Sequence, residues 1–262
     1  MRADVFLFTH GFARSRSHAC ALIKDGVFIS GEKILKPSFM IPDDTPAHAV
    51  KIERESPFVS RGGLKLEAAL KAFHVDVKGF CVLDIGASTG GFTDCLLRYG
   101  ADFVYALDVG HGQLAPSLLS DPRVKNIEGC NARYMEPSLF CRHIDMAVTD
   151  ISFISQKLIY GAVRAVLGVG APFISLIKPQ FEAGRENIGK NGIVKDARVH
   201  ENVICDLRES AKKEGLAMCA LCPSPITGGD GNREYTALFI TGGEVAVSDG
   251  DIEKTVKEAF AK

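Results

Sequence analysis

The sequence predicts a doubly wound α/β domain with a mostly parallel sheet, preceded by a small α+β domain. The 262 residues, 46% of them hydrophobic and 24% charged, are enough for one medium-sized and one small domain, each with a buried core. From about residue 60, apolar runs alternate with helix-like segments, as in sheets whose strands are joined by crossover helices. A Pro-containing stretch at 37–46 and Ser56-Pro57 precede that alternation. We therefore predict domains at residues 1–57 and 58–262.

The first domain is predicted to contain two helices followed by short strands. Helices are expected over residues 4–10 and 15–24, with Ser15 as the N-cap of the second, and strands over 27–29 and 31–35. Ser30-Gly31 between the two β-prone runs is typical of a tight hairpin turn.

The second domain is predicted to contain seven strands and four helices. The strands are expected at residues 81–85, 103–107, 124–127, 144–149, 172–177, 216–221 and 235–240, and the helices at 64–73, 91–99, 155–167 and 197–214. Residues 159–177 carry one charge, Arg164, but Gly168, Gly170 and Pro172 interrupt them, which favours a helix, a turn and a strand over a membrane span. The first four residues are not followed by the apolar h-region of a secretory signal, so we expect no signal peptide and no membrane partner.

Charge and cysteine content narrow the class of protein. The 31 basic and 32 acidic side chains nearly cancel, yet residues 1–36 hold six Lys/Arg against three acids. The eight cysteines lack the dense spacing of a disulfide-stabilised fold, which indicates reduced thiols and a cytoplasmic location. Cys219 and Cys222 form a lone CxxC without a second pair, so no metal site is expected.

A glycine-rich turn, DIGASTGGF at residues 84–92, joins the first strand of the second domain to a helix. Its glycines let the backbone approach a ligand closely, and Asp108 follows the next strand, where a carboxylate can accept both hydroxyls of an adenosine ribose. Ser88 replaces the central Gly of a dinucleotide fingerprint, which disfavours NAD, while Asp84 suits the sulfonium cation of S-adenosylmethionine. A turn without a ligand is the alternative. The candidate cofactor-binding residues are Asp84, Gly86, Ala87, Ser88, Gly90, Gly91, Phe92, Asp108 and Val109.

Four charged residues lie where they could meet at one edge of the sheet. Asp150 and Lys178 follow predicted strands, Glu234 precedes the last strand, and Lys65 lies on the helix before the first strand. Each alone is typically a solvated or ion-paired side chain. Together they could act on a hydroxyl, because a partly desolvated Lys beside carboxylates can have its proton affinity tuned for general-base work.

The turn and these four residues resemble FtsJ-type ribose 2′-O-methyltransferases, whose Lys-Asp-Lys-Glu tetrad matches Lys65, Asp150, Lys178 and Glu234. The first domain resembles the RNA-binding domain named from ribosomal protein S-four. That likeness is carried by Arg2-Ala3-Asp4, Arg14-Ser15-Arg16-Ser17, IKDGV at 23–27 and Gly31-Glu32-Lys33. The combination is similar to the TlyA family of rRNA methyltransferases, often labelled hemolysins, over almost the whole chain.

This resemblance implies that the second domain is a Rossmann-like methyltransferase that uses S-adenosylmethionine. It also implies that the substrate is a cytidine ribose in rRNA or in ribosomal subunits. Lys178 would be the base or polarising group, oriented by Asp150, while Lys65 and Glu234 hold the nucleotide. Asn131 stands where the family often has an acid at the adenine amine, and Ala87-Ser88-Thr89 also departs from the family's turn. The implied RNA-binding residues are Arg2, Arg14, Arg16, Lys24 and Lys33.

Other interpretations remain open from the sequence. The family's older label suggests a membrane-active cytolysin, and a non-catalytic RNA-binding module with a relic pocket is a third hypothesis. Residues 179–196, rich in Gly and charge, are expected to form a loop over the substrate, or a segment without function. Phe92 and Phe181 either stack on a base or pack internally, and the chain is either a monomer or a dimer.

Overall fold

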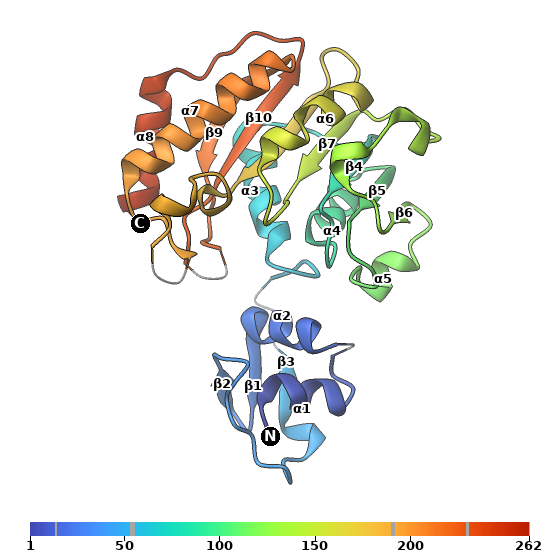
Figure 1. Cartoon of the computed structure of the whole chain (residues 1–262). Coiled ribbons are helices and arrows are strands. Elements are labelled where there is room, and N and C mark those ends of the chain that lie inside the picture. Colours follow the sequence, from blue (N-terminus) through green and yellow to red (C-terminus); the bar gives the residue numbers. More distant parts are fainter. Residues whose placement is uncertain (14, 53–55, 190–191, 229–230, 262) are drawn as a thin grey trace. The chain divides into compact units, whose positions relative to one another are not determined.

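The computed structural model describes residues 1–13, 15–52, 56–189, 192–228 and 231–261. These residues form two compact units, Met1–Arg61 and Gly62–Lys262 (Figure 1). The boundary expected from the sequence lies between residues 57 and 58, shortly before the one that the structure shows.

The first unit packs two helices on a three-stranded antiparallel sheet. The elements are α1 (Ala3–Thr9), α2 (Arg16–Gly26), β1 (Val27–Ile29), β2 (Glu32–Ile34) and β3 (Val50–Ile52), with strand order β2-β1-β3. The Ser15 hydroxyl accepts the His18 backbone N–H at 3.1 Å, which confirms the predicted N-cap. Ser30 and Gly31 have φ of 52° and 83°, the left-handed turn that joins β1 to β2 as expected. Strand β3 was not predicted.

The second unit is built on a seven-stranded sheet of order β6-β5-β4-β7-β8-β10-β9. The strands are β4 (Cys81–Ile85), β5 (Phe103–Leu107), β6 (Val124–Ile127), β7 (Met146–Thr149), β8 (Pro172–Ile177), β9 (Leu216–Pro223) and β10 (Tyr235–Thr241). Strands β4 to β8 are parallel, and β10 runs antiparallel to both β8 and β9. All seven predicted strands are present, and the sheet is mostly parallel as expected.

Helices cover both faces of this sheet (Figure 1). They are α3 (Gly62–Phe73), α4 (Gly91–Arg98), α5 (Pro116–Leu119), α6 (Tyr160–Val166), α7 (Ala197–Lys213) and α8 (Asp249–Ala261). Apolar side chains of α6, α7 and α8 share one core with Leu83 and Ile85 of β4. Helices α3 and α4 contact each other on the opposite face. Asp84 lies between Leu83 and Ile85 in β4, so its side chain points to that face, where it meets Thr93 of α4.

Residues 159–177 form α6, a turn and β8, as the glycines and Pro172 predicted. Within the described ranges, no helix is long and apolar enough to cross a membrane. The sequence did not predict α8. Its start carries a capping box, in which the Asp251 N–H is donated to the Ser248 hydroxyl and the Ser248 N–H to Asp251 Oδ2.

Candidate active site

The glycine-rich turn between β4 and α4 brings backbone close to neighbouring segments. Gly86 has φ of +82°, and a Cβ there would lie 3.0 Å from Ile151 Cγ2. Gly90 precedes α4 with φ of +93°, and a Cβ there would lie 2.2 Å from Leu118 Cδ1. The positive φ favours glycine at both positions, and at position 86 the Ile151 backbone at 3.3 Å also leaves little space for a side chain. Ser88 also has a positive φ, 49°, which places strain in the turn itself.

Asp84, at the end of β4, is fully buried beneath the turn. The Thr93 hydroxyl donates to Asp84 Oδ2 at 2.6 Å, whereas Oδ1 has no hydrogen-bond partner among the described residues. The pKa of this carboxyl is raised from 3.8 to about 7, chiefly by burial and in smaller part by the charge of nearby Asp150, although the hydrogen bond from Thr93 opposes this shift. A cationic ligand group nearby would stabilise the buried charge of this carboxylate and offset the cost of its unpaired oxygen.

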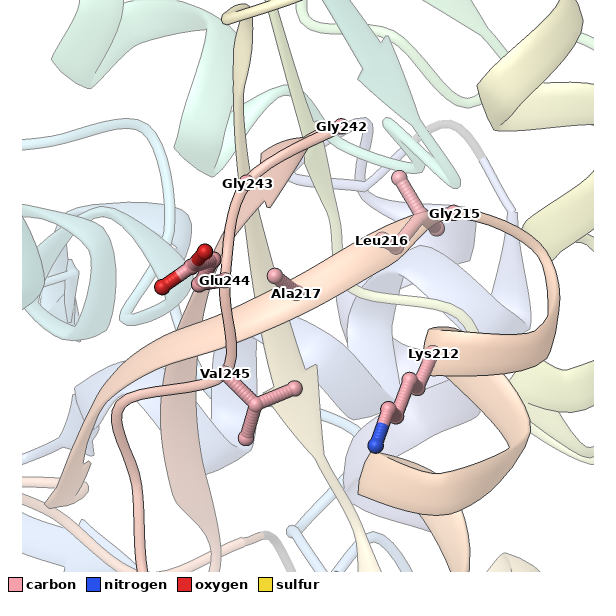
Figure 2. A pocket seen from close by; sticks show the side chains of 8 residues that line it. All are labelled: Lys212, Gly215, Leu216, Ala217, Gly242, Gly243, Glu244 and Val245. Carbon is pink, nitrogen blue, oxygen red and sulfur yellow. The ribbon is translucent and has the colours of Figure 1, made fainter.

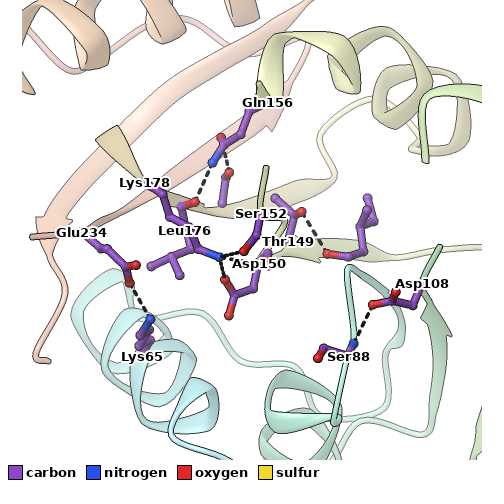
Figure 3. Close-up of polar contacts among 12 residues, drawn as sticks. Lys65, Ser88, Asp108, Thr149, Asp150, Ser152, Gln156, Leu176, Lys178 and Glu234 are labelled. Carbon is purple, nitrogen blue, oxygen red and sulfur yellow. Dashed lines mark hydrogen bonds and ion pairs between the residues drawn. The ribbon is translucent and has the colours of Figure 1, made fainter. Parts of the chain in front are cut away.

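Asp108, which follows β5, ties two loops together. Its Oδ2 accepts the Ser88 N–H at 2.8 Å (Figure 3). Its Oδ1 accepts the Gly110 N–H at 2.7 Å. Each carboxylate oxygen has two lone pairs, so both oxygens can still accept a ligand hydroxyl. The Ser88 hydroxyl in turn donates to the Gln113 side chain at 3.0 Å.

A pocket opens at the carboxyl ends of β4, β5 and β7. Its volume, about 390 Å³, lies in the range of small-molecule sites. Five of the predicted cofactor-binding residues line it: Gly86, Ser88, Asp108, Val109 and Asn131. Asp84, Ala87, Gly90, Gly91 and Phe92 do not line it. Phe92 is only 3% exposed, so its ring packs internally.

One wall of this pocket was missed by sequence reasoning. It consists of residues 151–154, directly after Asp150. Gln113 also lines the pocket and was not predicted. The rule that selected Asp150, that ligand-binding residues follow strand ends, would also have found this wall. Phe153 is 87% exposed with φ of 67°, and its ring lies 5.0 Å from that of Phe181.

The four predicted catalytic residues form two ion pairs beside this pocket (Figure 3). Lys178 Nζ lies 2.5 Å from Asp150 Oδ1 and donates to the Asp150 carbonyl at 3.2 Å and to the Ser152 hydroxyl at 2.8 Å. Lys65 Nζ lies 2.5 Å from Glu234 Oε2, and both of these side chains are buried. A Cβ on Gly228 would lie 2.6 Å from Glu234 Oε1, so that glycine leaves room for the carboxylate.

Strand direction explains why these residues meet. Strands β7 and β8 are parallel, so Asp150 and Lys178 leave the sheet at the same edge. Strand β10 is antiparallel to β8, so Glu234, which precedes it, returns to that edge. Lys65 reaches Glu234 from α3. Within the described ranges, no group of His, Cys, Asp and Glu side chains could hold a metal ion.

The segment after β8 contains short 3₁₀ turns at Pro179–Phe181 and Arg185–Asn187. Its far end is held by two buried side chains. The Val194 N–H is donated to Asn232 Oδ1 at 3.1 Å, and the Val194 carbonyl lies 3.0 Å from His200 Nε2. Since a carbonyl only accepts, His200 carries its proton on Nε2 and accepts from the Tyr235 hydroxyl at 2.8 Å. Burial lowers the His200 pKa, which favours this neutral form. That the segment covers a substrate stays a prediction.

A second pocket, of about 360 Å³, lies at the other edge of the sheet, where β10 ends and β9 begins (Figure 2). Its charged lining residues are Lys212 and Glu244. None of the predicted site residues lines it, and it lies away from the carboxyl ends of the parallel strands.

Two of the predicted RNA-binding residues of the first unit, Arg2 and Arg16, share the buried partner Asp4. Asp4 accepts from Arg2 Nε at 2.9 Å and from an Arg16 terminal nitrogen at 2.7 Å. The hydrogen bonds from Arg2 and then Arg16 lower the Asp4 pKa to about 2, although burial opposes them. Lys33 lies over the Phe28 ring. Arg14 and the side chain of Lys24 lie outside the described residues.

A doubly wound sheet with a glycine-rich turn, a buried acid and a Lys-Asp-Lys-Glu set defines the class of S-adenosylmethionine-dependent methyltransferases. Comparison with known proteins agrees with this class. The model of the family described as FtsJ-like methyltransferase matches residues 58–240. TlyA of Mycobacterium tuberculosis, a 16S/23S rRNA (cytidine-2′-O)-methyltransferase, is 39% identical over 262 residues, covering 100% of this chain and 97% of TlyA.

Two further relatives carry a different label. Hemolysin A of Brachyspira hyodysenteriae is 40% identical over 92% of this chain and 100% of its own length. The solved structure of a candidate hemolysin from Streptococcus thermophilus is 41% identical, with a TM-score of 0.81 over 100% of this chain and 96% of that chain. The chain belongs to the FtsJ-like methyltransferases, in the group that includes the TlyA rRNA methyltransferases.

Proposed function

We propose that the chain methylates the 2′-hydroxyl of a cytidine ribose in ribosomal RNA, with S-adenosylmethionine as the methyl donor. The observation that carries this proposal is the pair of ion pairs Lys178–Asp150 and Lys65–Glu234 beside the pocket of the glycine-rich turn. The substrate is inferred from the TlyA relatives, whose names specify rRNA and cytidine.

The residues of the pocket fit S-adenosylmethionine. Asp108 lines the pocket and retains acceptor capacity for ribose hydroxyls. Asp84 does not line the pocket, but its buried carboxylate beneath the turn, with Oδ1 unpaired among the described residues, would attract a cationic group bound above it. Gly86 keeps the turn close to Ile151 without blocking the pocket. When bound, the cofactor supplies an electrophilic methyl group on a sulfonium ion. Asn131, whose side-chain oxygen accepts the Arg133 N–H at 3.1 Å, lines the same pocket and would contact the adenine.

Lys178 would act on the 2′-oxygen as a polarising cation. Three oxygens, two from Asp150 and one from Ser152, surround its amino group, which is the environment of an ammonium ion. Its three N–H groups are all engaged, so one of these contacts would give way to the 2′-oxygen. The new N–H···O bond would orient a lone pair of that oxygen for attack. As the C–O bond forms, the bond between the methyl group and the sulfonium sulfur would break and S-adenosylhomocysteine would leave. The proton of the 2′-oxygen would pass to the Asp150 carboxylate. Alignment of the reactants can remove roughly 7–11 kcal/mol of barrier.

The other two residues would shape the nucleotide site. Lys65 and Glu234 neutralise each other in a buried pair, so they are suited to hold the nucleotide rather than to exchange protons. The exposed Phe153 ring at the pocket wall offers a flat surface on which an unstacked base can lie. This role would fall to Phe153 with Phe181, whereas Phe92 is internal.

The first unit would bind RNA phosphates through Arg2 and Arg16, with Arg14, Lys24 and Lys33 as further candidates. Asp4 holds both guanidinium groups while their side chains stay about half exposed, at 47% and 58%. Fixed, outward-facing guanidinium groups suit phosphate recognition, because little side-chain freedom is lost on binding.

The experiment that tests this proposal uses separated ribosomal subunits from a strain that lacks the enzyme. Incubation with the purified chain and labelled S-adenosylmethionine should place the label on a ribose 2′-oxygen in rRNA, and mapping would identify the nucleotide. Protein carrying Lys178→Ala is the control. Label on a base, or no label with either subunit, would contradict the proposal.

A further inference from the structure

Glu182 joins two loops that carry the candidate catalytic residues. The β7 loop, residues 150–155, carries Asp150 and the pocket wall, and the β8 loop, residues 178–182, carries Lys178. Glu182 Oε2 accepts from the Ser155 hydroxyl at 2.6 Å, and its Oε1 accepts the Gln156 N–H at 2.8 Å. Both oxygens of a residue in the β8 loop are therefore used to hold the end of the β7 loop.

The environment of Glu182 shows that its hydrogen bonds with Ser155 and Gln156 are not surface contacts. Its side chain is partly buried, and that burial raises its pKa. Lys157, whose charge acts on Glu182, is ion-paired with Asp206. The two donors from Ser155 and Gln156 are thus the direct partners of the carboxylate. Removing the carboxylate would leave both donors without their acceptor, which is costly in a partly buried site.

Gln156 fixes the same end of the β7 loop to the sheet. Its side chain is 2% exposed, donates to the Leu176 carbonyl at 2.5 Å and accepts from the Ser175 hydroxyl at 2.5 Å (Figure 3). Gln156 is therefore bound to β8 through its side chain and to the β8 loop through its backbone. The β7 loop is held at this end by Glu182 and Gln156 and at the other by the Lys178–Asp150 pair.

We propose that Glu182 is a positioning residue of the methyl transfer reaction. By holding the β7 loop against the β8 loop, it sets both the pocket wall at residues 151–154 and the alignment of Lys178 with Asp150. Glu182 neither lines the pocket nor contacts either ion pair among the described residues. This inference rests on the proposed function.

The test compares Glu182→Gln with Glu186→Gln. Glu186 is an exposed residue of the same segment, and its substitution makes the same change in charge and shape. We expect Glu182→Gln to weaken S-adenosylmethionine binding and to slow single-turnover methylation at saturating cofactor, each roughly tenfold, since small misplacements of catalytic groups have large effects on rate. Binding to ribosomal subunits should be unchanged. For Glu186→Gln, the cofactor affinity, the methylation rate and the binding to ribosomal subunits should each stay within twofold of the wild type.

A double-mutant cycle separates this role from a general effect on folding. Ser155→Ala removes one donor of the same contact, so its effect on the rate should be largely absent in the Glu182→Gln background. All rates are measured at a temperature where circular dichroism shows each variant folded. The proposal is overturned if Glu182→Gln keeps the wild-type rate and cofactor affinity within twofold, or if the two substitutions are simply additive. Failure of the wild type to methylate would instead contradict the proposed function.

Discussion

Lys178 and Glu234 lie beside each other at one edge of the sheet, although they flank strands that run in opposite directions. Ile177 and Tyr235 are partners in the antiparallel β8–β10 ladder, so the residue after β8 and the residue before β10 are adjacent. Each then pairs with a different partner, Lys178 with Asp150 and Glu234 with Lys65. The reversed strand β10 thus adds an acid to an edge that parallel strands alone supply with Asp150 and Lys178.

Lys178→Ala should reduce single-turnover methylation at least roughly 100-fold, the lower end of what general acid–base or polarising groups contribute. Lys178→Arg, which keeps the positive charge but cannot lose a proton, should retain more activity than Lys178→Ala if the amino group polarises the 2′-oxygen. Cofactor binding measured by calorimetry should be preserved in both variants. Equal loss in the two variants would favour a base instead, and full activity of Lys178→Ala would remove the residue from the mechanism.

Binding of S-adenosylmethionine should weaken as the pH falls below 7. The pKa of Asp84 in the folded chain is about 7, above its ordinary value of 3.8, so below pH 7 the carboxyl is increasingly neutral and no longer attracts a cation. The dissociation constant should rise toward tenfold per pH unit between pH 7.0 and 5.5. The stability of the ligand-free chain should instead fall as the pH rises from about 3.8 to 7. The reason is that the carboxyl loses its proton less readily in the folded chain, where it is buried, than in the unfolded chain.

Calorimetry over this pH range, together with Asp84→Asn, checks the assignment. Asparagine has no charge to titrate, so this variant should bind the cofactor weakly and with little dependence on pH. A wild-type affinity that does not change between pH 5.5 and 7.0 would exclude Asp84 as the partner of the cationic group.

Gly86→Ala should impair cofactor binding, whereas Gly79→Ala should not. Both glycines have a positive φ, +82° and +78°, so each substitution should cost roughly 1–2 kcal/mol of stability. Only the Cβ at position 86 meets a neighbour, Ile151 at 3.0 Å, and nothing lies within 4 Å of the Cβ at position 79. Thermal unfolding and S-adenosylmethionine titration of both variants give the comparison. Equal affinities would show that Gly86 matters only for backbone conformation.

Asp4→Asn should weaken binding to ribosomal RNA even though it removes a negative charge from the first unit. If Asp4 orients Arg2 and Arg16, its loss frees both guanidinium groups, and the first unit then contacts fewer phosphates. Binding should therefore also depend less steeply on the salt concentration. Asp44→Asn, at an exposed position of the same unit, makes the same charge change and should leave binding unchanged or slightly stronger. Stronger binding by Asp4→Asn would mean that charge alone governs the contact.

Much of the fold follows from local pattern. Strands 81–85 and 172–177 are short apolar runs bounded by glycine, proline or charge, and their ends agree with the structure. Ser15 and Ser30-Gly31 were assignable because caps and tight turns depend on a few adjacent residues. Helix α8 had a similar signal, the Ser248–Asp251 capping box, which sequence reasoning overlooked. Strand β3, like β1 and β2, has three residues, too few for a periodic pattern, and it lacks the Ser30-Gly31 turn that identified the other two.

The sequence by itself determined the mostly parallel sheet, the glycine-rich turn and the four charged residues, because each depends on short-range pattern or a local motif. Only the tertiary structure decided which of those residues pair, since Lys65 and Glu234 are 169 positions apart and meet through strand order and direction. It also placed Phe92 inside the core, put residues 151–154 along the pocket and bound Arg2 and Arg16 to Asp4. Contacts of this kind depend on how distant segments pack, which hydrophobic periodicity does not specify.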